Sequence, residues 1–282
     1  MTHFEQTLTL YDPTDRPTPR FLAVADPRVA CLNLIPLILQ WQGYPDRALA
    51  RSREGLAAAH ELGHAFTLSH ALHLNCWLHQ VRREPQMARE HAVLQMSLAA
   101  EQGFPAGSAS GMFFYGWVLA ADGETAAGIA QMRQGLAQQD ATGAHQLQVA
   151  HYLGLLAGSC TQAGSPAEAL ELLAEAVEYV DRTEERWFEA ELHRLKGEAL
   201  LALPSDHALD AEACFHKALA VARGQSTRLW ELRAATGLAR LWRDQGKRTD
   251  ACDLLAPIYG WFTEGFDTPD LRESKALIDE LR

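Results

Sequence analysis

The segment GYPDRALARSREGLAAAHELG, residues 43–63, reads as one helix between two stops. Pro45 can open a helix because the first turn needs no amide donor, and Gly63 marks where the helix ends. Within the segment, Ala48 and Gly55 are seven residues apart and so lie on one helical face. Small residues on one face let a second helix pack closely, so the segment predicts one half of a tightly packed helix pair.

Small residues recur with a fixed spacing along the whole chain. The positions equivalent to Ala48 are separated by 40, 40, 41, 42 and 40 residues and are Ala48, Ala88, Gly128, Ala169, Ala211 and Ala251. Seven positions after each of them comes a second, mostly small residue, and an apolar residue usually follows it. A fixed period of this length is the signature of a repeat protein. The chain is therefore predicted to build its core along an array, with each repeat packing on its neighbours.

Each repeat is expected to contain two antiparallel helices. Glycines at Gly43, Gly123, Gly164 and Gly246 stop the first helix of a pair. Pro36 interrupts the first predicted helix, where it should remove a hydrogen bond and cause a bend or a later helix start. The predicted pairs cover residues 28–42 and 46–62, 65–83 and 85–102, 106–121 and 124–141, 145–163 and 166–182, 185–203 and 207–224, and 227–245 and 247–259.

Two flanking segments lie outside the six pairs, which are assigned to residues 27–260. Residues 1–26 combine Met1–Leu10, which has the pattern of the end of a second helix, with a connection rich in proline. This pattern predicts that the chain begins within a repeat and was cut from a longer protein. Residues 261–282 are predicted to close the array with an aromatic plug and a capping helix, the alternative being a docking patch for a partner.

Composition argues against several functional classes. The formal net charge of -11 and a pI near 5.5 disfavour a nucleic-acid groove, which needs positive potential. The longest apolar stretches are shorter than the roughly 20 residues of a membrane span, and no signal peptide pattern is present. Five widely spaced cysteines without a CxxC pair indicate packing residues in a reducing compartment. We expect a cytoplasmic protein with neither nucleic acid nor membrane as a partner.

Motifs for catalysis or cofactor binding are missing from the sequence. Only Lys247 follows a glycine, and Arg248 comes next instead of the Ser or Thr of a phosphate-binding loop. Neither a GxSxG nor an HExxH motif occurs. His70 and His73 could share a metal, but no acidic residue stands at a matching ligand position on their helix. We therefore predict no enzyme activity, no cofactor and no metal site.

The spacing of Ala211, Phe215 and Ala218 resembles the second helix of a tetratricopeptide repeat, in an extended form longer than the standard 34 residues. The segment at residues 43–63, RTEERWFEAELHRLKGEALL at 182–201 and LLAPIYGWFTEGFDTPDLRESKALIDEL at 254–281 resemble the C-terminal repeat region of large bacterial predicted-ATPase proteins. In that family an adenylate or guanylate cyclase domain, or another signalling module, typically precedes the ATPase. The resemblance implies an all-α, right-handed superhelical array of antiparallel helix pairs. It would be an α-solenoid of about six repeats of 40–42 residues with a C-terminal capping helix, in a signalling protein.

In tetratricopeptide arrays the first helix of each pair lines a concave groove, and counting back from the small residues predicts the side chains that point inward. Aromatic and imidazole groups come early and guanidinium groups late, which suits a peptide with apolar anchors and a carboxylate. Alternatively, Trp77 and Trp117 pack between helices, while Arg240 and Arg243 pair with Asp244 or Glu231. The predicted groove residues are Asn33, His70, His73, Trp77, Gln80, Phe113, Trp117, His151, Arg194, Arg233, Arg240 and Arg243.

Two functions are consistent with this sequence. The favoured one is a non-catalytic protein–protein interaction and regulatory domain that binds a peptide or partner segment. Its partners would include upstream ATPase or cyclase domains, or a second copy of the chain. The alternative is a small-molecule effector sensor that uses the same concave face. A closed apolar cavity near Trp77 and Trp117 would favour the sensor, and an open groove would favour the peptide.

Overall fold

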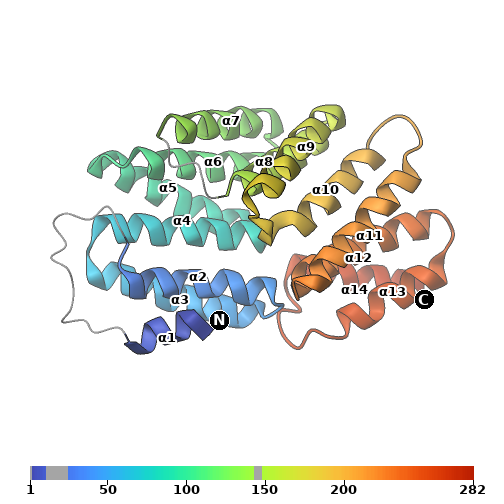
Figure 1. Ribbon diagram of the computed structural model, residues 1–282, viewed down its shortest axis with the longest axis horizontal. Helices are drawn as coiled ribbons and strands as arrows, with labels where there is room; N and C mark the ends of the chain where they lie inside the picture. Colours follow the sequence, from blue (N-terminus) through green and yellow to red (C-terminus); the bar gives the residue numbers. More distant parts are fainter. Residues whose placement is uncertain (1, 11–24, 143–147) are drawn as a thin grey trace. The chain divides into compact units, whose positions relative to one another are not determined.

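The computed structural model describes residues 2–10, 25–142 and 148–282, and within these ranges the chain is all-α (Figure 1). Fourteen α-helices and one short 3-10 helix follow one another without a strand in the described residues. They are α1 (Thr2–Leu10), α2 (Pro27–Trp41), α3 (Pro45–Leu62), α4 (Ala65–Val81), α5 (Pro85–Gln102), α6 (Pro105–Ala121), α7 (Thr125–Thr142), α8 (Val149–Gln162), α9 (Pro166–Thr183), η3 (Arg186–Phe188), α10 (Glu189–Leu201), α11 (Ala208–Gly224), α12 (Arg228–Asp244), α13 (Arg248–Tyr259) and α14 (Pro269–Leu281).

The recurring small residues lie where helices pack most closely. Ala48, Ala88, Ala169, Ala211 and Ala251 are all 0% exposed, and Gly128 is buried. The second small position is equally tight. A Cβ atom on Gly135 of α7 would lie 2.9 Å from the backbone oxygen of Ala109 and the backbone nitrogen of Phe113, both on α6. Backbone cannot move aside as a side chain can, so only glycine fits there.

Left-handed backbone marks both kinds of turn in the repeat. Between the first and second helix of a pair, Gly43, Gly123, Gly164 and Gly246 have φ values between 79° and 96°. Arg83 occupies the same place with a φ of 60°, although it carries a side chain. Glu184 and Ser226 likewise take positive φ values after second helices, where Gly63 and Gly103 stand earlier in the chain. The turn geometry is therefore kept even where glycine, which adopts it at least cost, is replaced.

The chain divides into two compact units, which we describe separately. Unit 1 comprises Met1–Gln40, Tyr44–Asp122 and Ala130–Ala144, and unit 2 comprises Trp41–Gly43, Gly123–Ile129 and His145–Arg282. In unit 1, α4 packs against α3, α5 and α6. In unit 2, α10 packs against α8, α9, α11 and α12, while α12 also packs against α13 and α14. Both α4 and α10 thus touch the second helix of their own pair and the first helix of the next repeat in the same unit.

Three details differ from the sequence expectation or extend it. α2 runs through Pro36, so the predicted later helix start is wrong; the buried neighbours Ile35 and Leu37 hold this part of the helix in the core. The helix predicted from residue 185 begins instead with η3, and α10 starts at Glu189. The capping helix is present as α14, and Phe262 beside it is 5% exposed within the apolar core of unit 2. The connection predicted to be rich in proline lies largely outside the described residues.

Candidate functional site

The seven groove residues predicted in unit 1 fall into an accessible and an enclosed set. His70, His73 and Trp117 keep part of their surface exposed. Asn33, Trp77, Gln80 and Phe113 are between 0% and 6% exposed and pack between helices. The first three therefore offer a partner more surface than the other four.

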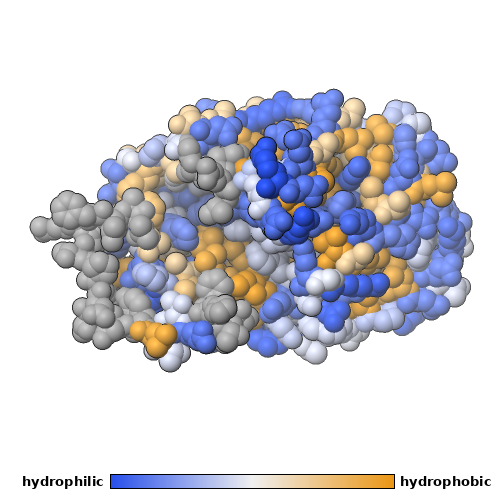
Figure 2. Space-filling model, viewed as in Figure 1, coloured by the Kyte–Doolittle hydropathy of each residue, from blue (hydrophilic) through white to orange (hydrophobic). Residues whose placement is uncertain are grey.

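The accessible residues sit on two adjacent helices, α4 and α6, and we call this surface the α4–α6 face, defined by His70, His73 and Trp117. The ring centroid of His73 is 5.6 Å from that of Phe114 on α6 and 6.5 Å from that of Trp77 on its own helix. Burial lowers the pKa of His70, so its imidazole is neutral at neutral pH and can accept as well as donate a hydrogen bond. Figure 2 shows apolar surface in unit 1 where α2 and α4 run in Figure 1.

Asn33 belongs to a buried amide cluster that also contains Asn75 and Ser52. The Nδ2 atom of Asn75 donates to Asn33 Oδ1 at 3.0 Å, and the Ser52 hydroxyl donates to Asn75 Oδ1 at 2.5 Å. Asn33 in turn donates to the backbone oxygen of Val29 at 2.8 Å. A Cβ atom on Gly55 would come within 2.9 Å of the Asn33 side chain. The cluster therefore joins α2, α3 and α4, and its atoms are committed to helix packing.

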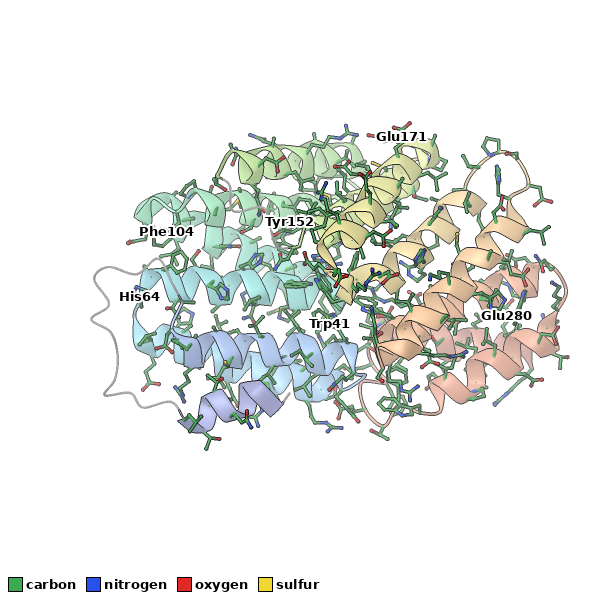
Figure 3. All side chains as sticks on the ribbon, viewed as in Figure 1. Trp41, His64, Phe104, Tyr152, Glu171 and Glu280 are labelled. Atoms are coloured by element: carbon green, nitrogen blue, oxygen red, sulfur yellow. The ribbon has the colours of Figure 1, made fainter. Side chains whose placement is uncertain are left out.

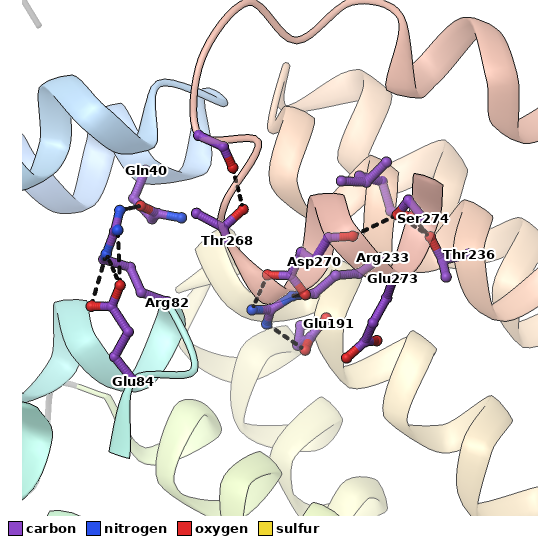
Figure 4. A network of polar contacts seen from close by, with 12 residues as sticks. Gln40, Arg82, Glu84, Glu191, Arg233, Thr236, Thr268, Asp270, Glu273 and Ser274 are labelled. Carbon is purple, nitrogen blue, oxygen red and sulfur yellow. Dashed lines mark hydrogen bonds and ion pairs between the residues drawn. The ribbon is translucent and has the colours of Figure 1, made fainter. Parts of the chain in front are cut away.

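A second polar cluster in unit 1, which sequence reasoning did not predict, lies at the end of α4 (Figure 4). Arg82 is 4% exposed and donates to Glu84, to Gln40 Oε1 at 3.2 Å and to the backbone oxygen of Pro45 at 2.8 Å. The Nδ1 atom of His79 is 2.6 Å from Glu84 Oε2. Burial by itself would raise the pKa of Glu84, but hydrogen bonds from His79 and Arg82 and the charge of Arg82 outweigh it and lower the pKa to about 2. The cluster ties the α4–α5 turn to the α2–α3 pair.

In unit 2, the predicted groove residue His151 is enclosed by aromatic rings. Its side chain is 0% exposed, and its ring centroid lies 4.9 Å from Phe188, 5.3 Å from Trp187 and 5.7 Å from Tyr152. Figure 3 labels Tyr152 within α8 and Glu171 at the outer edge of α9. His151 is thus part of an aromatic core, not of an accessible surface.

The four predicted arginines of unit 2 all bind carboxylates of the chain itself. Arg233 makes a two-pronged contact with Asp270 at 2.8 and 3.0 Å and reaches Glu191 at 3.2 Å (Figure 4). Arg194 pairs with Glu191 and Glu198, and Arg240 pairs with Glu273 at 2.9 Å. Arg243 pairs with Asp244, as the alternative interpretation predicted, and also with Glu280. Glu231 instead pairs with Arg223 and Arg228.

Each of these four guanidinium groups is paired inside unit 2. Burial alone would raise the pKa of Glu191, but the guanidinium groups of Arg194 and Arg233 outweigh burial and lower it. A bidentate pair such as Arg233 with Asp270 already uses the geometry in which arginine would grip a ligand carboxylate. The carboxylates of Asp270 and Glu191 therefore bind Arg233 in the way that was predicted for the carboxylate of a bound peptide.

The structure adds a cleft of about 460 Å³ in unit 1, between α1, α2 and α3. It lies away from Trp77 and Trp117, where the sensor alternative placed its cavity. Its signal in the sequence was an apolar stripe on one face of α2 combined with basic residues on one face of α3. The lining residues are Leu8, Leu32, Ile35, Leu39, Arg47, Ala50, Arg51 and Glu54.

The described residues were also compared with what a metal site and a membrane-spanning helix require. In the described part of the chain, no three His, Cys, Asp or Glu side chains are grouped closely enough to hold a metal ion, so His70 and His73 have no third ligand there. None of the helices in the described ranges is long and apolar enough to cross a membrane.

Comparisons with known proteins match the fold but no sequence family. No protein-family model and no curated protein matches the chain, so the expected ATPase or cyclase parent has no family evidence. A Rap protein complexed with competence and sporulation factor has a similar structure, with a TM-score of 0.66, 14% identity, and coverage of 100% of this chain and 79% of that one. A second similar structure is that of the nearly identical TPR-like repeats of a putative kinesin light chain from Podosopora anserina. Its TM-score is 0.48 and its identity 18%, and the match covers 68% of this chain and 92% of that one. The chain therefore has a tetratricopeptide-like helical-repeat fold.

Proposed function

We propose that this chain is a non-catalytic protein-interaction and regulatory repeat domain of a cytoplasmic bacterial signalling protein, and that it binds a peptide or extended partner segment on the α4–α6 face. The observation that carries the proposal is that His70, His73 and Trp117 remain accessible on two adjacent first helices of unit 1. Aromatic residues that need little ordering on binding are good anchors for a peptide.

The geometry narrows the chemistry of the proposed partner. The arginines expected to hold a carboxylate are already paired with Asp270, Glu191, Glu273 and Glu280. The neutral imidazole of His70 and the indole of Trp117 favour a segment with apolar side chains and backbone amides over an acidic one. The proposed partner segment is therefore apolar and uncharged where it meets this face.

The fold of the Rap protein supports the proposal, because that protein binds a factor in its solved complex. A partner in upstream ATPase or cyclase domains, or in a second copy of the chain, rests on the sequence resemblance alone. We include these domains and a second copy of the chain as candidates that could supply the bound segment.

Selection from a library of short random peptides tests the proposal. We expect enrichment of apolar, uncharged sequences, and we expect Trp117→Ala or His73→Ala to weaken the best of them by at least about tenfold. Leu94→Ala is the matched control, because Leu94 is 54% exposed on the second helix α5 and lies outside the α4–α6 face. Enrichment of no peptide, or equal losses in all three variants, would contradict the proposal.

A further inference from the structure

The cleft beside α1 has an apolar floor of defined length. Leu32, Ile35 and Leu39 on α2 are spaced by three and four residues and so share one face of the helix. The stripe from Leu32 to Leu39 is about 10 Å long, because each helical residue adds about 1.5 Å. Leu8 of α1 contributes to the same cleft. The volume of about 460 Å³ lies within the range of small-molecule sites.

Basic side chains stand along one edge of this floor. Arg47 and Arg51 are one helical turn apart on α3, and Glu54 is the one acidic residue among the described residues that line the cleft. Arg51 Nη1 donates to Glu54 Oε2 at 2.7 Å, with both side chains more than half exposed, so water weakens that pair. The Arg47 guanidinium lies 3.7 Å from the centre of the Tyr44 ring, which restrains it.

The sign of this edge is opposite to that of the chain as a whole. The formal net charge of the protein is -11, yet the part of the cleft lining that the structure describes carries two guanidinium groups and one carboxylate. An apolar floor with a net positive rim complements a molecule that has an alkyl body and one anionic head.

We propose that this cleft binds an alkyl monocarboxylate of medium chain length. The alkyl chain lies along Leu32, Ile35 and Leu39, and the carboxylate accepts hydrogen bonds from Arg47 and Arg51. The site is separate from the α4–α6 face, and the proposal does not depend on peptide binding there.

Titration calorimetry with decanoate, kept below its micelle concentration, tests the head group and the chain together. We expect saturable binding of one decanoate per chain, at least about tenfold tighter than binding of 1-decanol, because the alcohol lacks the charge-assisted hydrogen bonds. The double variant R47Q/R51Q should lose at least about tenfold in decanoate affinity. Arg53→Gln is the control, because Arg53 is exposed on α3 but does not line the cleft. Equal affinity for decanoate and decanol, or equal losses in R47Q/R51Q and R53Q, would overturn the proposal.

A blocking variant locates the bound molecule. Ala50 lines the cleft but is exposed, so Ala50→Trp should fold while its indole occupies the space above the apolar stripe. We expect it to abolish decanoate binding, whereas Ala100→Trp on the exposed side of α5 should leave it unchanged. Decanoate binding that persists in a folded Ala50→Trp protein would overturn the proposal, and peptide binding at the α4–α6 face should be the same in both variants.

Discussion

The pairs Asn33–Asn75 in unit 1 and Glu191–Arg233 in unit 2 perform the same task with different chemistry. In each pair the partners are 42 residues apart and join the first helices of neighbouring repeats. The amides are neutral and 2% and 3% exposed, whereas Glu191 is 4% exposed and carries a charge beside two guanidinium groups. A buried polar link thus joins neighbouring first helices in both units, and it is neutral in unit 1 and charged in unit 2.

The difference decides how each link fails. A neutral amide that loses its partner leaves one polar group without a hydrogen bond, which costs about 1 to 3 kcal/mol. A buried ion that loses its partner leaves a charge in a poorly hydrated site, which costs more. The Glu191–Arg233 link is therefore expected to be more sensitive to a single substitution than the Asn33–Asn75 link.

The largest expected effect is that of Arg233→Ala. The substitution removes the partner shared by Glu191 and Asp270, and we expect it to reduce the free energy of unfolding by about 3 to 5 kcal/mol. Urea denaturation measures the loss of unfolding free energy. Amide hydrogen exchange then shows whether the protection of α12 is reduced. Arg240→Ala is the control, because Arg240 and Glu273 are 43% and 38% exposed and their pair should contribute less than about 1 kcal/mol. Equal losses in the two variants would remove the distinction between buried and exposed pairs.

The next effect is a pH dependence in unit 1. Burial, reinforced by the charge of His79, lowers the pKa of His91 to about 4. Between that value and the unfolded pKa of about 6.5, the unfolded chain binds more protons than the folded one. Stability should therefore fall by roughly 3 kcal/mol as the pH decreases from 6.5 to 4. Urea denaturation at both pH values tests this, and His91→Gln should remove most of the fall; an unchanged pH dependence in that variant would refute the assignment.

Asn75→Ala tests the neutral link directly. We expect it to reduce the free energy of unfolding by about 2 to 3 kcal/mol, because Asn33 and Ser52 lose their buried partner. The loss should be the same at pH 7 and pH 5, since amides do not titrate. A loss as large as that of Arg233→Ala would show that charge is not what separates the two links.

Enlarging a small residue should reduce stability less than the substitutions above, and the size of the reduction should depend on the position. Ala169 is 0% exposed and Ala174 on the same helix is exposed. Ala169→Leu should therefore cost about 1 to 3 kcal/mol through overpacking, and Ala174→Leu much less. Thermal denaturation of both variants gives the answer, and equal melting temperatures would contradict the assigned helix register.

The smallest effects are expected at the turns. Gly164 has a φ of 79° and open space around its missing Cβ, so Gly164→Ala should cost about 1 kcal/mol from backbone strain alone. Arg83→Gly at the equivalent turn of unit 1 should change stability by less than about 1 kcal/mol, because relief of strain is offset by a more flexible unfolded chain. Thermal denaturation distinguishes the two, and a larger effect at Arg83 would show that its side chain stabilises the turn.

The fold could be predicted because its determinants are local and repeated. Small residues at a fixed spacing identify the close helix contacts, and glycines identify most of the turns. Arg83, Glu184 and Ser226 could not be recognised as left-handed from their own chemistry, because residues with side chains seldom adopt that conformation. Their positions in the period were the one available sign.

The candidate site was only partly predictable because the exposure and pairing of its side chains depend on residues that are distant in sequence. Counting along the repeat placed Arg233, Arg240 and Arg243 on first helices, but it could not show that Asp270, Glu273 and Glu280 of α14 pair with them. The same counting placed Asn33 and His151 on an inner face, where neighbouring helices bury them. Whether a polar side chain meets solvent or a partner is decided by tertiary packing.

The position of Arg233 has a mechanical consequence for unit 2. One guanidinium on α12 holds carboxylates from both α10 and α14, so pulling α14 away must break both hydrogen bonds between Arg233 and Asp270. Each small displacement is opposed until both bonds to Asp270 have broken. We therefore expect α14 to detach from α12 in a single cooperative step. Force spectroscopy would record this step as one sharp rupture.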